Sequence, residues 1–359
     1  MKNLILFMPS IEIGGVEKNL FLIANYLEKK SIIIKLITSN KKYIKKLNKN
    51  IKIVSINNDF FLKQKKYIKY FFCLILLFLE YCKNRNIVVF SFQANIYAVL
   101  LCKLLRIKII TRSNTSPKGW SKNIIKKKIF EFIIKYADLI IVNSLEFQKQ
   151  MKIIFKVNTK LIYNPLNKNE ILKSTKKKLN NSRLKIINVA RFTEQKDHVT
   201  LLKAFKLLIQ KNKDAFLIII GRGYKEKNIK KFIYKNKLNK NIKLITNIQN
   251  PYGYIKWADV FVLTSKYEGL PNVLLEALCL KKYIISTDCP TGPREILNNG
   301  KYGDLVKIGD YKKISSLLNN YKKNQSKINK KIHSGFLNLN KYDFKSNCEE
   351  YYNSIKKFL

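Results

Sequence analysis

Short apolar runs rich in Ile, Val, Leu and Phe alternate with segments of helical periodicity along most of the chain. The helical segments include Val16–Leu27, Ala94–Leu105 and Val199–Gln210. Strands that alternate with helices predict an α/β fold with parallel, doubly wound sheets. The apolar runs predict strands at residues 4–8, 32–38, 51–56, 87–92, 107–111 and 139–142, and again at 184–190, 216–220, 244–246, 259–263 and 283–286.

The length and an internal change of composition predict two domains. A chain of 359 residues can bury a large core and is longer than most single domains. Between Leu166 and Arg183 the chain is mainly Lys, Asn and Ser with little periodicity, which is typical of a connection. We therefore predict a first domain at 1–165, a connection at 166–183 and a second domain at 184–341.

Two segments combine apolar and basic residues in a way that leaves their environment open. Tyr70–Leu79 is ten apolar residues, too few to cross a bilayer as a helix, and four lysines precede it between 63 and 69. Ile124–Tyr136 is a basic amphipathic helix. Each segment fits a helix that covers a sheet with its lysines in water, or a helix that lies in a membrane interface. The apolar start, Met1–Met8, is expected to be a strand and not a signal peptide.

The formal charge of +48 points to an anionic partner only weakly. The charge comes almost entirely from lysines scattered along the whole chain, and arginine, the residue that reads phosphates and bases bidentately, occurs only seven times. We interpret the charge mainly as compositional, so nucleic acid is not the expected partner, while an anionic membrane surface stays open. The six cysteines show no C-x-x-C pair, which predicts reduced thiols in a reducing compartment.

The stretch Thr264–Glu276 carries the strongest candidate chemistry. It follows the predicted strand at 259–263, and Pro271 suits the first turn of a helix whose free backbone N–H groups attract an anion. Glu268 in the turn and Glu276 inside the helix could accept hydrogen bonds from sugar hydroxyls beside that anion. A phosphate next to a sugar suggests a nucleotide sugar.

Further loops leave the carboxyl ends of predicted strands, where ligands bind in parallel sheets. Arg191 and Lys196 follow the strand at 184–190 and are suited to neutralise a diphosphate, although solvated salt bridges would explain them equally well. Gly221 begins a Gly-x-Gly turn after the next strand. Such a turn is weak evidence, since most are only turns.

The first half offers similar candidates at its own strand ends. Gly14 and Gly15 would let a ligand approach the backbone closely, or would simply form a tight turn. Arg112, Ser113 and Asn114 are candidate contacts on the acceptor side, with helix capping as the equal alternative.

Glu268 and Glu276 are separated by seven residues within Y-E-G-L-P-N-V-L-L-E-A, which closely resembles the family 4 retaining glycosyltransferases of the GT-B fold. Gly14-Gly15-Val16-Glu17, the basic loop Arg191–Asp197 and Thr291–Glu295 are similar to further motifs of that family. The resemblance implies two Rossmann-like domains that face a central cleft, with a last helix at about 342–359 that crosses back to the first domain.

The resemblance also implies roles for residues. Arg191 and Lys196 would hold the diphosphate, and Glu268 would contact the transferred sugar. Glu276 would hold the ribose, and Gly15 would approach the diphosphate from the first domain. The backbone of Gly269, Leu270, Pro271 and Asn272 would hold the phosphate and sugar oxygens of the donor. Gly221 is a further candidate donor contact.

The chain departs from the family in one respect. Many members place a histidine near the reacting sugar in the first domain, but this chain has only His198 and His333. His198 is expected to pack or to cap a helix, and His333 to lie on a helix surface. Ser113 or Asn114 would then supply the missing hydrogen bond without a titrating group.

These features predict a retaining glycosyltransferase that needs neither a metal nor a resident cofactor, with the nucleotide sugar as co-substrate. It would move a hexose or N-acetylhexosamine, expected to be UDP-linked, to a growing cell-surface glycan on a lipid carrier. The expected location is the cytoplasm, with peripheral attachment to the inner face of the membrane left open. A nucleotide-sugar epimerase and a basic nucleic-acid-binding protein are the alternatives.

Overall fold

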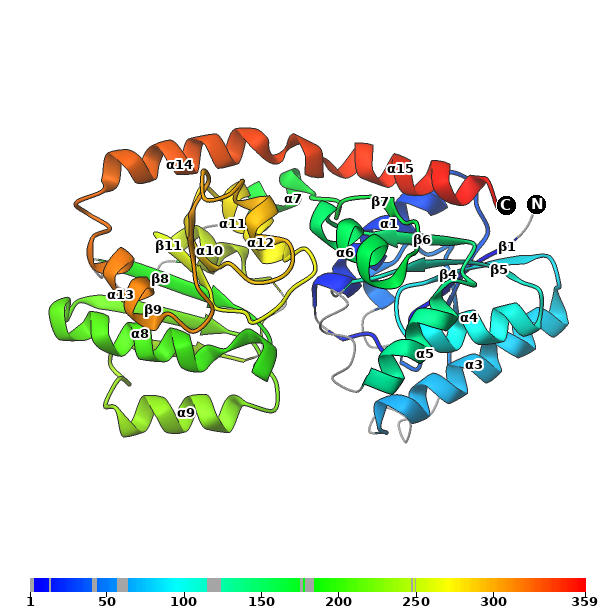
Figure 1. The fold of residues 1–359 in the computed structure, drawn as a ribbon, viewed down its shortest axis with the longest axis horizontal. Coiled ribbons are helices and arrows are strands. Elements are labelled where there is room, and N and C mark those ends of the chain that lie inside the picture. Colours follow the sequence, from blue (N-terminus) through cyan, green and yellow to red (C-terminus); the bar gives the residue numbers. More distant parts are fainter. Residues whose placement is uncertain are drawn as a thin grey trace. The chain divides into compact units, whose positions relative to one another are not determined.

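The chain forms two compact units, Met1–Pro165 with Phe344–Leu359, and Leu166–Asp343 (Figure 1). They are seen in a computed structural model that describes residues 3–12, 14–40, 44–56, 64–114, 124–174, 177, 184–246, 248 and 250–359. Both units are parallel sheets covered by helices, so the predicted α/β class is confirmed.

The first unit contains a seven-stranded parallel sheet in the order β3-β2-β1-β4-β5-β6-β7. Its central strands are short, apolar and buried, as their sequences predict. The order reverses direction between β1 and β4, which pair in register from Asn3 with Ile87 to Phe7 with Ser91. The strands are β1 (Asn3–Phe7), β2 (Ile34–Ile37), β3 (Lys52–Val54), β4 (Ile87–Ser91), β5 (Lys108–Arg112), β6 (Leu139–Val142) and β7 (Lys160–Leu161).

Helices cover both faces of this sheet. One face packs on α1 (Gly15–Glu28) and α15 (Phe344–Lys356). The other packs on α3 (Lys66–Lys83), α4 (Asn95–Leu104) and α5 (Ile124–Ile134). A short turn, η1 (Ile44–Lys46), and α6 (Leu145–Phe155), which packs on a smaller core, complete the unit.

The second unit repeats this topology with a six-stranded parallel sheet in the order β10-β9-β8-β11-β12-β13. The reversal of strand order falls between β8 and β11, where Val260 pairs with Ile186. The strands are β8 (Leu184–Val189), β9 (Ala215–Ile220), β10 (Ile242–Ile245), β11 (Val260–Leu263), β12 (Tyr283–Thr287) and β13 (Asp304–Val306).

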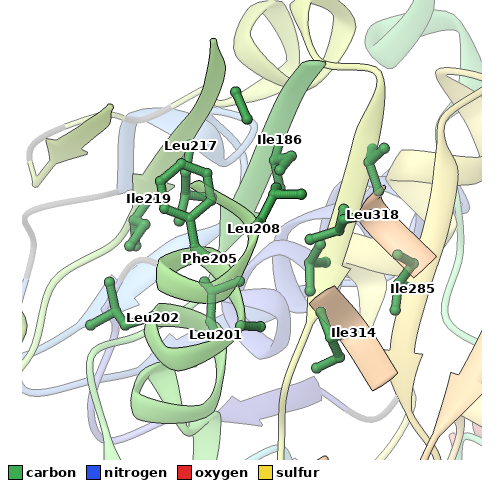
Figure 2. Packing of buried hydrophobic residues seen from close by; sticks show 14 of the residues in the cluster. Ile186, Leu201, Leu202, Phe205, Leu208, Leu217, Ile219, Ile285, Ile314 and Leu318 are labelled. Carbon is green, nitrogen blue, oxygen red and sulfur yellow. The ribbon is translucent and has the colours of Figure 1, made fainter. Parts of the chain in front are cut away.

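The main core of the second unit lies between its sheet and the amphipathic helices α8 (His198–Lys211), α9 (Glu226–Lys235), α13 (Tyr311–Asn319) and α14 (Gln325–Leu337). Figure 2 shows Leu201, Phe205 and Leu208 packed against sheet residues such as Ile186 and Leu217. The unit also contains α7 (Lys168–Leu172), η3 (Glu194–Lys196), α10 (Tyr252–Trp257), α11 (Asn272–Cys279), α12 (Pro293–Ile296) and η4 (Asn338–Tyr342).

The predicted connection at 166–183 is more ordered at its start than its composition suggested. It contains α7, whose first turn is capped by Asn167, because the Asn167 side chain accepts from the backbone N–H of Glu170 at 3.2 Å. Residues 175, 176 and 178–183 lie outside the described residues. Among the described residues, no helix combines the length and apolar composition needed to cross a membrane.

Candidate active site

The candidate residues of the second unit lie at one edge of its sheet. Strands β9, β8, β11 and β12 are neighbours, so the loops that leave their carboxyl ends lie side by side. The reversal of strand order between β8 and β11 opens a crevice at this edge, and that is where doubly wound sheets bind ligands. The loop after β8 carries Arg191 and Lys196, and the loop after β11 carries Glu268.

Hydrogen bonds join these two loops directly. The backbone N–H of Lys266 donates to the carbonyl oxygen of Gln195 at 2.8 Å, and Gln195 Nε2 donates to the carbonyl oxygen of Tyr267 at 2.7 Å. Thr264 Oγ1 donates to the carbonyl oxygen of Lys196 at 3.0 Å. The short turn η3 is therefore fixed against the loop after β11, and with it the direction of the Lys196 side chain.

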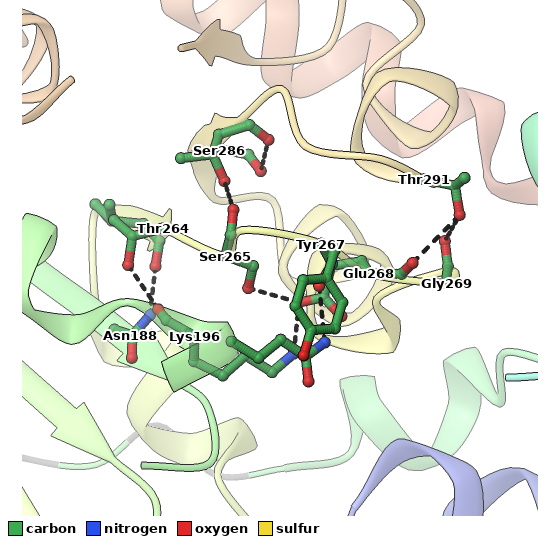
Figure 3. Close-up of polar contacts among 12 residues, drawn as sticks. Asn188, Lys196, Thr264, Ser265, Tyr267, Glu268, Gly269, Ser286 and Thr291 are labelled. Atoms are coloured by element: carbon green, nitrogen blue, oxygen red, sulfur yellow. Dashed lines mark hydrogen bonds and ion pairs between the residues drawn. The ribbon is translucent and has the colours of Figure 1, made fainter. Parts of the chain in front are cut away.

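Lys196 and Glu268 form an ion pair at the centre of this edge. Figure 3 shows Lys196 and Ser265 both reaching the Glu268 carboxylate. Lys196 Nζ lies 2.5 Å and Ser265 Oγ 2.6 Å from the same oxygen, Oε1, and Glu268 is only 6% exposed. The other oxygen, Oε2, accepts no hydrogen bond from the described residues. One side of the carboxylate is thus fixed while the other can accept a ligand hydroxyl.

The loop after β12 fixes the Glu268 turn from the other side. The backbone N–H of Glu268 donates to the carbonyl oxygen of Pro290 at 2.7 Å, and Thr291 Oγ1 donates to that of Gly269 at 2.9 Å (Figure 3). Gly292 has a φ of +89°, and a Cβ there would lie 2.3 Å from the Gly269 carbonyl oxygen. Only glycine fits at this close approach.

Helix α11 begins directly behind the Glu268 turn. Gly269, Leu270 and Pro271 are buried, and Pro271 is the N-cap, so it directly precedes the first helical residue, Asn272. In the described part of the chain, the N-cap makes no side-chain capping bond, and the first N–H groups of the helix carry a partial positive charge. Glu276 is 5% exposed one turn further, and Tyr252 Oη lies 3.4 Å from its Oε1.

The loop after β9 contributes packing. A Cβ at Gly221 would lie 1.9 Å from the carbonyl oxygen of Ala190, and one at Gly223 would lie 2.5 Å from that of Phe192. The backbone N–H of Phe192 donates to the carbonyl oxygen of Arg222 at 2.9 Å. The structure thus explains Gly221 by its contact with the loop after β8, and its predicted contact with the donor stays a prediction.

The Arg191 side chain, unlike that of Lys196, is not part of an ion pair among the described residues. Its side chain is exposed, and among the described residues it has no hydrogen-bond or ion-pair partner. Arg191 lies in the same loop as Lys196, the loop after β8, at the sheet edge that also carries Glu268. A second cation is therefore available at this edge without the need to break an existing bond.

His198 packs against the loop after β8, as expected. It is 4% exposed, its ring packs edge-on to Phe192 with 5.1 Å between ring centroids, and neither ring nitrogen has a hydrogen-bond partner in the described part of the chain. Burial, reinforced by the nearby charge of Lys196, lowers the pKa of His198 to about 4. The ring is thus neutral at pH 7. His333 lies exposed on α14, also as expected.

The first unit presents its predicted glycines at the start of α1. Gly14 is the N-cap of this helix in an extended conformation, and Gly15 is its exposed first residue. The Glu17 side chain folds back toward this end of the helix. Its Oε2 lies 2.7 Å from the position that a Cβ on Gly14 would occupy. A carboxylate near the first turn stabilises a helix, so Glu17 has a local role here.

Arg112 is placed differently from its predicted role. It is fully buried, and its guanidinium donates to Tyr351 Oη at 2.8 Å, to Asn164 Oδ1 at 2.5 Å and to Asn114. A direct contact with an acceptor would require Arg112 to leave these three partners. The structure thus gives it a role in holding α15 and Asn164 to the sheet, and this replaces the acceptor contact expected from its position after β5.

Ser113 and Asn114 remain at the carboxyl edge of the first sheet. Ser113 is 3% exposed, and its Oγ has no hydrogen-bond partner in the described ranges. Asn114 Nδ2 donates to the carbonyl oxygen of Phe92 at 2.9 Å, which links the loops after β5 and β4. Both are neutral polar groups, and their predicted contact with the acceptor stays a prediction.

Two contacts in the second unit were not predicted from the sequence. Ser265 donates to the same oxygen of Glu268 as Lys196 does. Tyr252, on α10, lies within hydrogen-bond distance of Glu276. A serine three residues before a glutamate in a turn is the signal that would have found the first. No local signal exists for the second, because Tyr252 and Glu276 lie on different helices.

Cysteines and metal-binding groups add little to this site. All six cysteines carry free thiols, and only Cys82 is exposed. In the described ranges, no three His, Cys, Asp or Glu side chains lie together in a way that would hold a metal ion.

Comparison with known proteins finds a family model that matches most of the second unit. Residues 169–335 match the family model described as glycosyl transferases group 1. An uncharacterized glycosyltransferase of Methanocaldococcus jannaschii is 33% identical over 240 residues, which are 58% of this chain and 59% of that protein. The chain therefore matches less than two thirds of that relative's length.

Two further comparisons concern a relative of named activity and the fold. The N-acetylgalactosamine-N,N'-diacetylbacillosaminyl-diphospho-undecaprenol 4-alpha-N-acetylgalactosaminyltransferase of Campylobacter jejuni is 26% identical over 66% of this chain and 67% of its own length. The crystal structure of HepE from Anabaena, in complex with UDP and glucose, superposes with a TM-score of 0.82 at 15% identity, covering 99% of this chain and 100% of HepE. This likeness shows that the fold is GT-B.

Proposed function

We propose that the protein transfers a sugar from a nucleotide sugar to a growing cell-surface glycan, since residues 169–335 match the model of the glycosyl transferases group 1 and the chain has the GT-B fold. The observation that carries the proposal is the Lys196–Glu268 pair at the reversal of strand order between β8 and β11. It places a cation and a half-free carboxylate side by side in a ligand crevice.

The cations would bind the diphosphate of the donor. The Lys196 ammonium has three N–H donors and uses one of them on Glu268, so it can bind a phosphate oxygen without leaving that carboxylate. Arg191 supplies a second cation from the same loop, and the N-terminus of α11 adds a fixed partial positive charge. These groups stabilise the negative charge that develops on the leaving β-phosphate, which lowers the barrier to transfer.

Glu268 would orient the transferred sugar. Its Oε1 is held by Lys196 and Ser265, so Oε2 is the oxygen that accepts from a sugar hydroxyl. In the proposed retaining reaction the acceptor oxygen bonds to the sugar C1 on the face that the phosphate leaves. The C1–phosphate oxygen bond breaks, and the acceptor proton passes to the leaving phosphate. We propose that these groups act without a metal ion.

Glu276 and the loop amides would complete the donor site. Glu276 would accept from ribose hydroxyls, with Tyr252 holding its Oε1 side. Gly221 and the backbone of Gly269–Asn272 would lie along the phosphates and the sugar. The complex of HepE with UDP and glucose supports a UDP-linked hexose as the donor, and the name of the Campylobacter N-acetylgalactosaminyltransferase supports an N-acetylhexosamine.

The acceptor would be a glycan on a lipid carrier. The name of the Campylobacter relative specifies a diphospho-undecaprenol acceptor, and this supports a similar acceptor class here. Gly14, Ser113 and Asn114 are the groups of the first unit proposed to face it, and Gly15 is proposed to approach the diphosphate of the donor. Such an acceptor would bring the protein to the cytoplasmic face of a membrane as a peripheral protein.

The test is a binding and turnover panel of UDP- and GDP-sugars, with wild type compared with Arg191→Ala and Lys196→Ala. We expect one donor to bind selectively and both variants to bind it at least tenfold more weakly. Arg85→Ala and Lys227→Ala, which remove exposed cations away from the site, are the matched controls.

Three outcomes would contradict the proposal. One is equal loss of binding in the control variants, because the effect would then be general charge. Another is absence of donor binding and turnover in folded wild type supplied with membrane acceptor lipids. A third is release of an epimerised sugar nucleotide with no transfer, which would favour an epimerase.

A further inference from the structure

Helix α3 is apolar on two opposite faces. Cys73 and Leu77 pack in the core under the sheet, and Tyr70 is buried against Tyr97 of α4. A second stripe at helical spacing, Tyr67, Phe71, Ile75 and Phe78, is exposed, and Phe71 is 61% exposed. A helix that is apolar all round is normally covered on all sides.

The neighbouring helices α4 and α5 continue this apolar surface. Leu104 on α4 is 80% exposed and Phe132 on α5 is 62% exposed, each at the end of a stripe of exposed apolar residues. The three helices pack side by side on one face of the sheet (Figure 1). Ring contacts link α3 to α4, with 5.9 Å between the centroids of Tyr70 and Tyr97. We call this surface the outer face of α3–α5.

The second unit shows what normally happens to such a layer. Between matching strands, α10, α11 and α12 occupy the positions of α3, α4 and α5. The middle helix, α11, is largely apolar like α4, but α7, α14 and η4 pack over it, and its residues from Leu274 to Cys279 are all buried. The middle helix of this layer is thus covered by the chain in the second unit, whereas α4 exposes Leu100 and Leu104 in the first.

The charge beside the outer face has one sign. Lys65, Lys66, Lys103 and Lys128 are exposed on or next to the three helices, and Lys103 Nζ lies 5.3 Å from the ring centroid of Tyr136. The helices contain only two acidic residues. Glu80 is buried between Lys35 and Lys83, and Glu131 pairs with Lys135. The surface therefore offers aromatic and aliphatic side chains bordered by cations.

We propose that the outer face of α3–α5 docks on an anionic lipid bilayer, with its aromatic side chains in the interface and its lysines at the headgroups. Aromatic and aliphatic side chains bordered by lysines match both layers of such a surface. A protein partner would match the apolar stripes but leave the excess lysines without a stated counterpart. The inference locates the membrane association of the proposed function, but it does not depend on the transfer reaction.

The experiment measures co-sedimentation of the full chain with vesicles of phosphatidylglycerol and phosphatidylcholine. The test variant Phe71→Ser/Leu104→Ser/Phe132→Ser removes one exposed side chain from each helix. The control Ile153→Ser/Tyr234→Ser/Leu337→Ser removes three that are similarly exposed elsewhere. We expect the test variant to bind anionic vesicles more than tenfold more weakly and the control to bind like wild type.

A second pair of variants separates charge from apolar contact. Lys65→Glu/Lys128→Glu should weaken binding severalfold, with a shallower salt dependence, whereas Lys227→Glu/Lys231→Glu on α9 should change it little. Binding of UDP, followed in the same samples, should be unchanged in all variants, so failure of the donor proposal would be seen separately.

Wild type that does not bind anionic vesicles, or a test variant that binds as tightly as its control, would overturn the proposal. So would a wild type that forms dimers which the test variant loses, with no vesicle binding, because the outer face would then be a contact between copies. Circular dichroism of each variant establishes that it is folded.

Discussion

The two sheets share one topology, but their carboxyl edges differ in charge. At the reversal of strand order in the second unit, Lys196 and Glu268 are paired and Arg191 is exposed. At the corresponding edge of the first unit, the described residues after β1 include two carboxylates, Glu12 and Glu17, and the loops after β4 and β5 carry neutral amides, as in the bond from the backbone N–H of Ser10 to Gln93 Oε1 at 2.8 Å. Arg112, at the end of β5, points into the unit.

This difference shows how one architecture can supply two kinds of site. The strands bring loops to an edge, and the loop residues decide what the edge binds. Ionic groups suit a diphosphate whose charge grows during reaction, and neutral hydroxyl and amide groups suit a glycan. Substitutions in either unit test this difference, and the following variants are ordered from the largest expected effect to the smallest.

Glu268→Gln should have the largest effect. The amide keeps the size of the side chain but removes the charge that pairs with Lys196. We expect kcat/KM for transfer to fall roughly a thousandfold, about 4 kcal/mol, with the protein still folded. Steady-state kinetics measures this, and Glu226→Gln on α9 is the control. A variant that retains half of wild-type turnover would contradict the charged-edge assignment.

Arg112→Leu should affect folding and not transfer chemistry. The change leaves Tyr351, Asn164 and Asn114 without their shared donor, and such losses cost about 3 kcal/mol in unfolding free energy. Urea unfolding measures the change, with exposed Arg85→Leu as the control. Unchanged stability together with a raised KM for the acceptor would instead restore Arg112 as an acceptor contact.

His198 makes the stability of the second unit depend on pH. Its pKa falls from 6.5 to about 4 on folding, so between these values the unfolded chain binds the proton and the folded chain does not. Stability is therefore lost as the pH falls from about 7 toward 4. We expect about 2 kcal/mol less stability at pH 5 than at pH 7.5 from this group. His198→Phe should remove most of that difference, measured by urea unfolding at both pH values.

The control for this prediction is His333→Phe, because His333 is exposed on α14. It should keep the wild-type pH dependence. If His198→Phe and wild type lose the same stability between pH 7.5 and 5, the buried ring is not the cause.

Ser265→Ala should have the smallest effect. It removes the hydroxyl that lies 2.6 Å from Glu268 Oε1 but keeps the Lys196 bond. One hydrogen bond to a charged group is worth about 1.5 kcal/mol, so kcat should fall roughly tenfold with little change in the dissociation constant of the donor. Exposed Ser316→Ala is the control. Weaker donor binding with unchanged kcat would place Ser265 in binding and not in the orientation of Glu268.

Much of the fold could be read from the sequence because buried parallel strands are continuous apolar runs. Leu184–Val189 and Val260–Leu263 are such runs, and the helices between them are amphipathic. The sequence also indicated that Lys196 and Glu268 share an edge although 72 positions separate them, because both follow strands of one parallel sheet. Strand β13 was not predicted, since three residues give no clear pattern.

Side-chain direction could not be read in the same way. Arg112 follows a strand end, as a ligand contact would, but its partner Tyr351 lies 239 positions away and is invisible to any local pattern. Gly221 was a candidate ligand contact because it begins a turn at a strand end. In the structure, the close approach of the Ala190 backbone is what requires glycine at this position. The apolar residues of α3 predict a helix that is apolar on both its inner and its outer face, but they do not indicate what covers the outer face.

The division of the first unit between the two ends of the chain affects its synthesis. The unit needs α15, because Cys348, Tyr351 and Ile355 are part of its core. These residues leave the ribosome only after Leu166–Asp343, which at about 5–20 residues per second takes roughly 10–35 s. The second unit is contiguous and can fold during that time. The nascent first unit must wait with the α15 side of this sheet face uncovered and only α1 packed on it, so apolar surface is exposed during this interval.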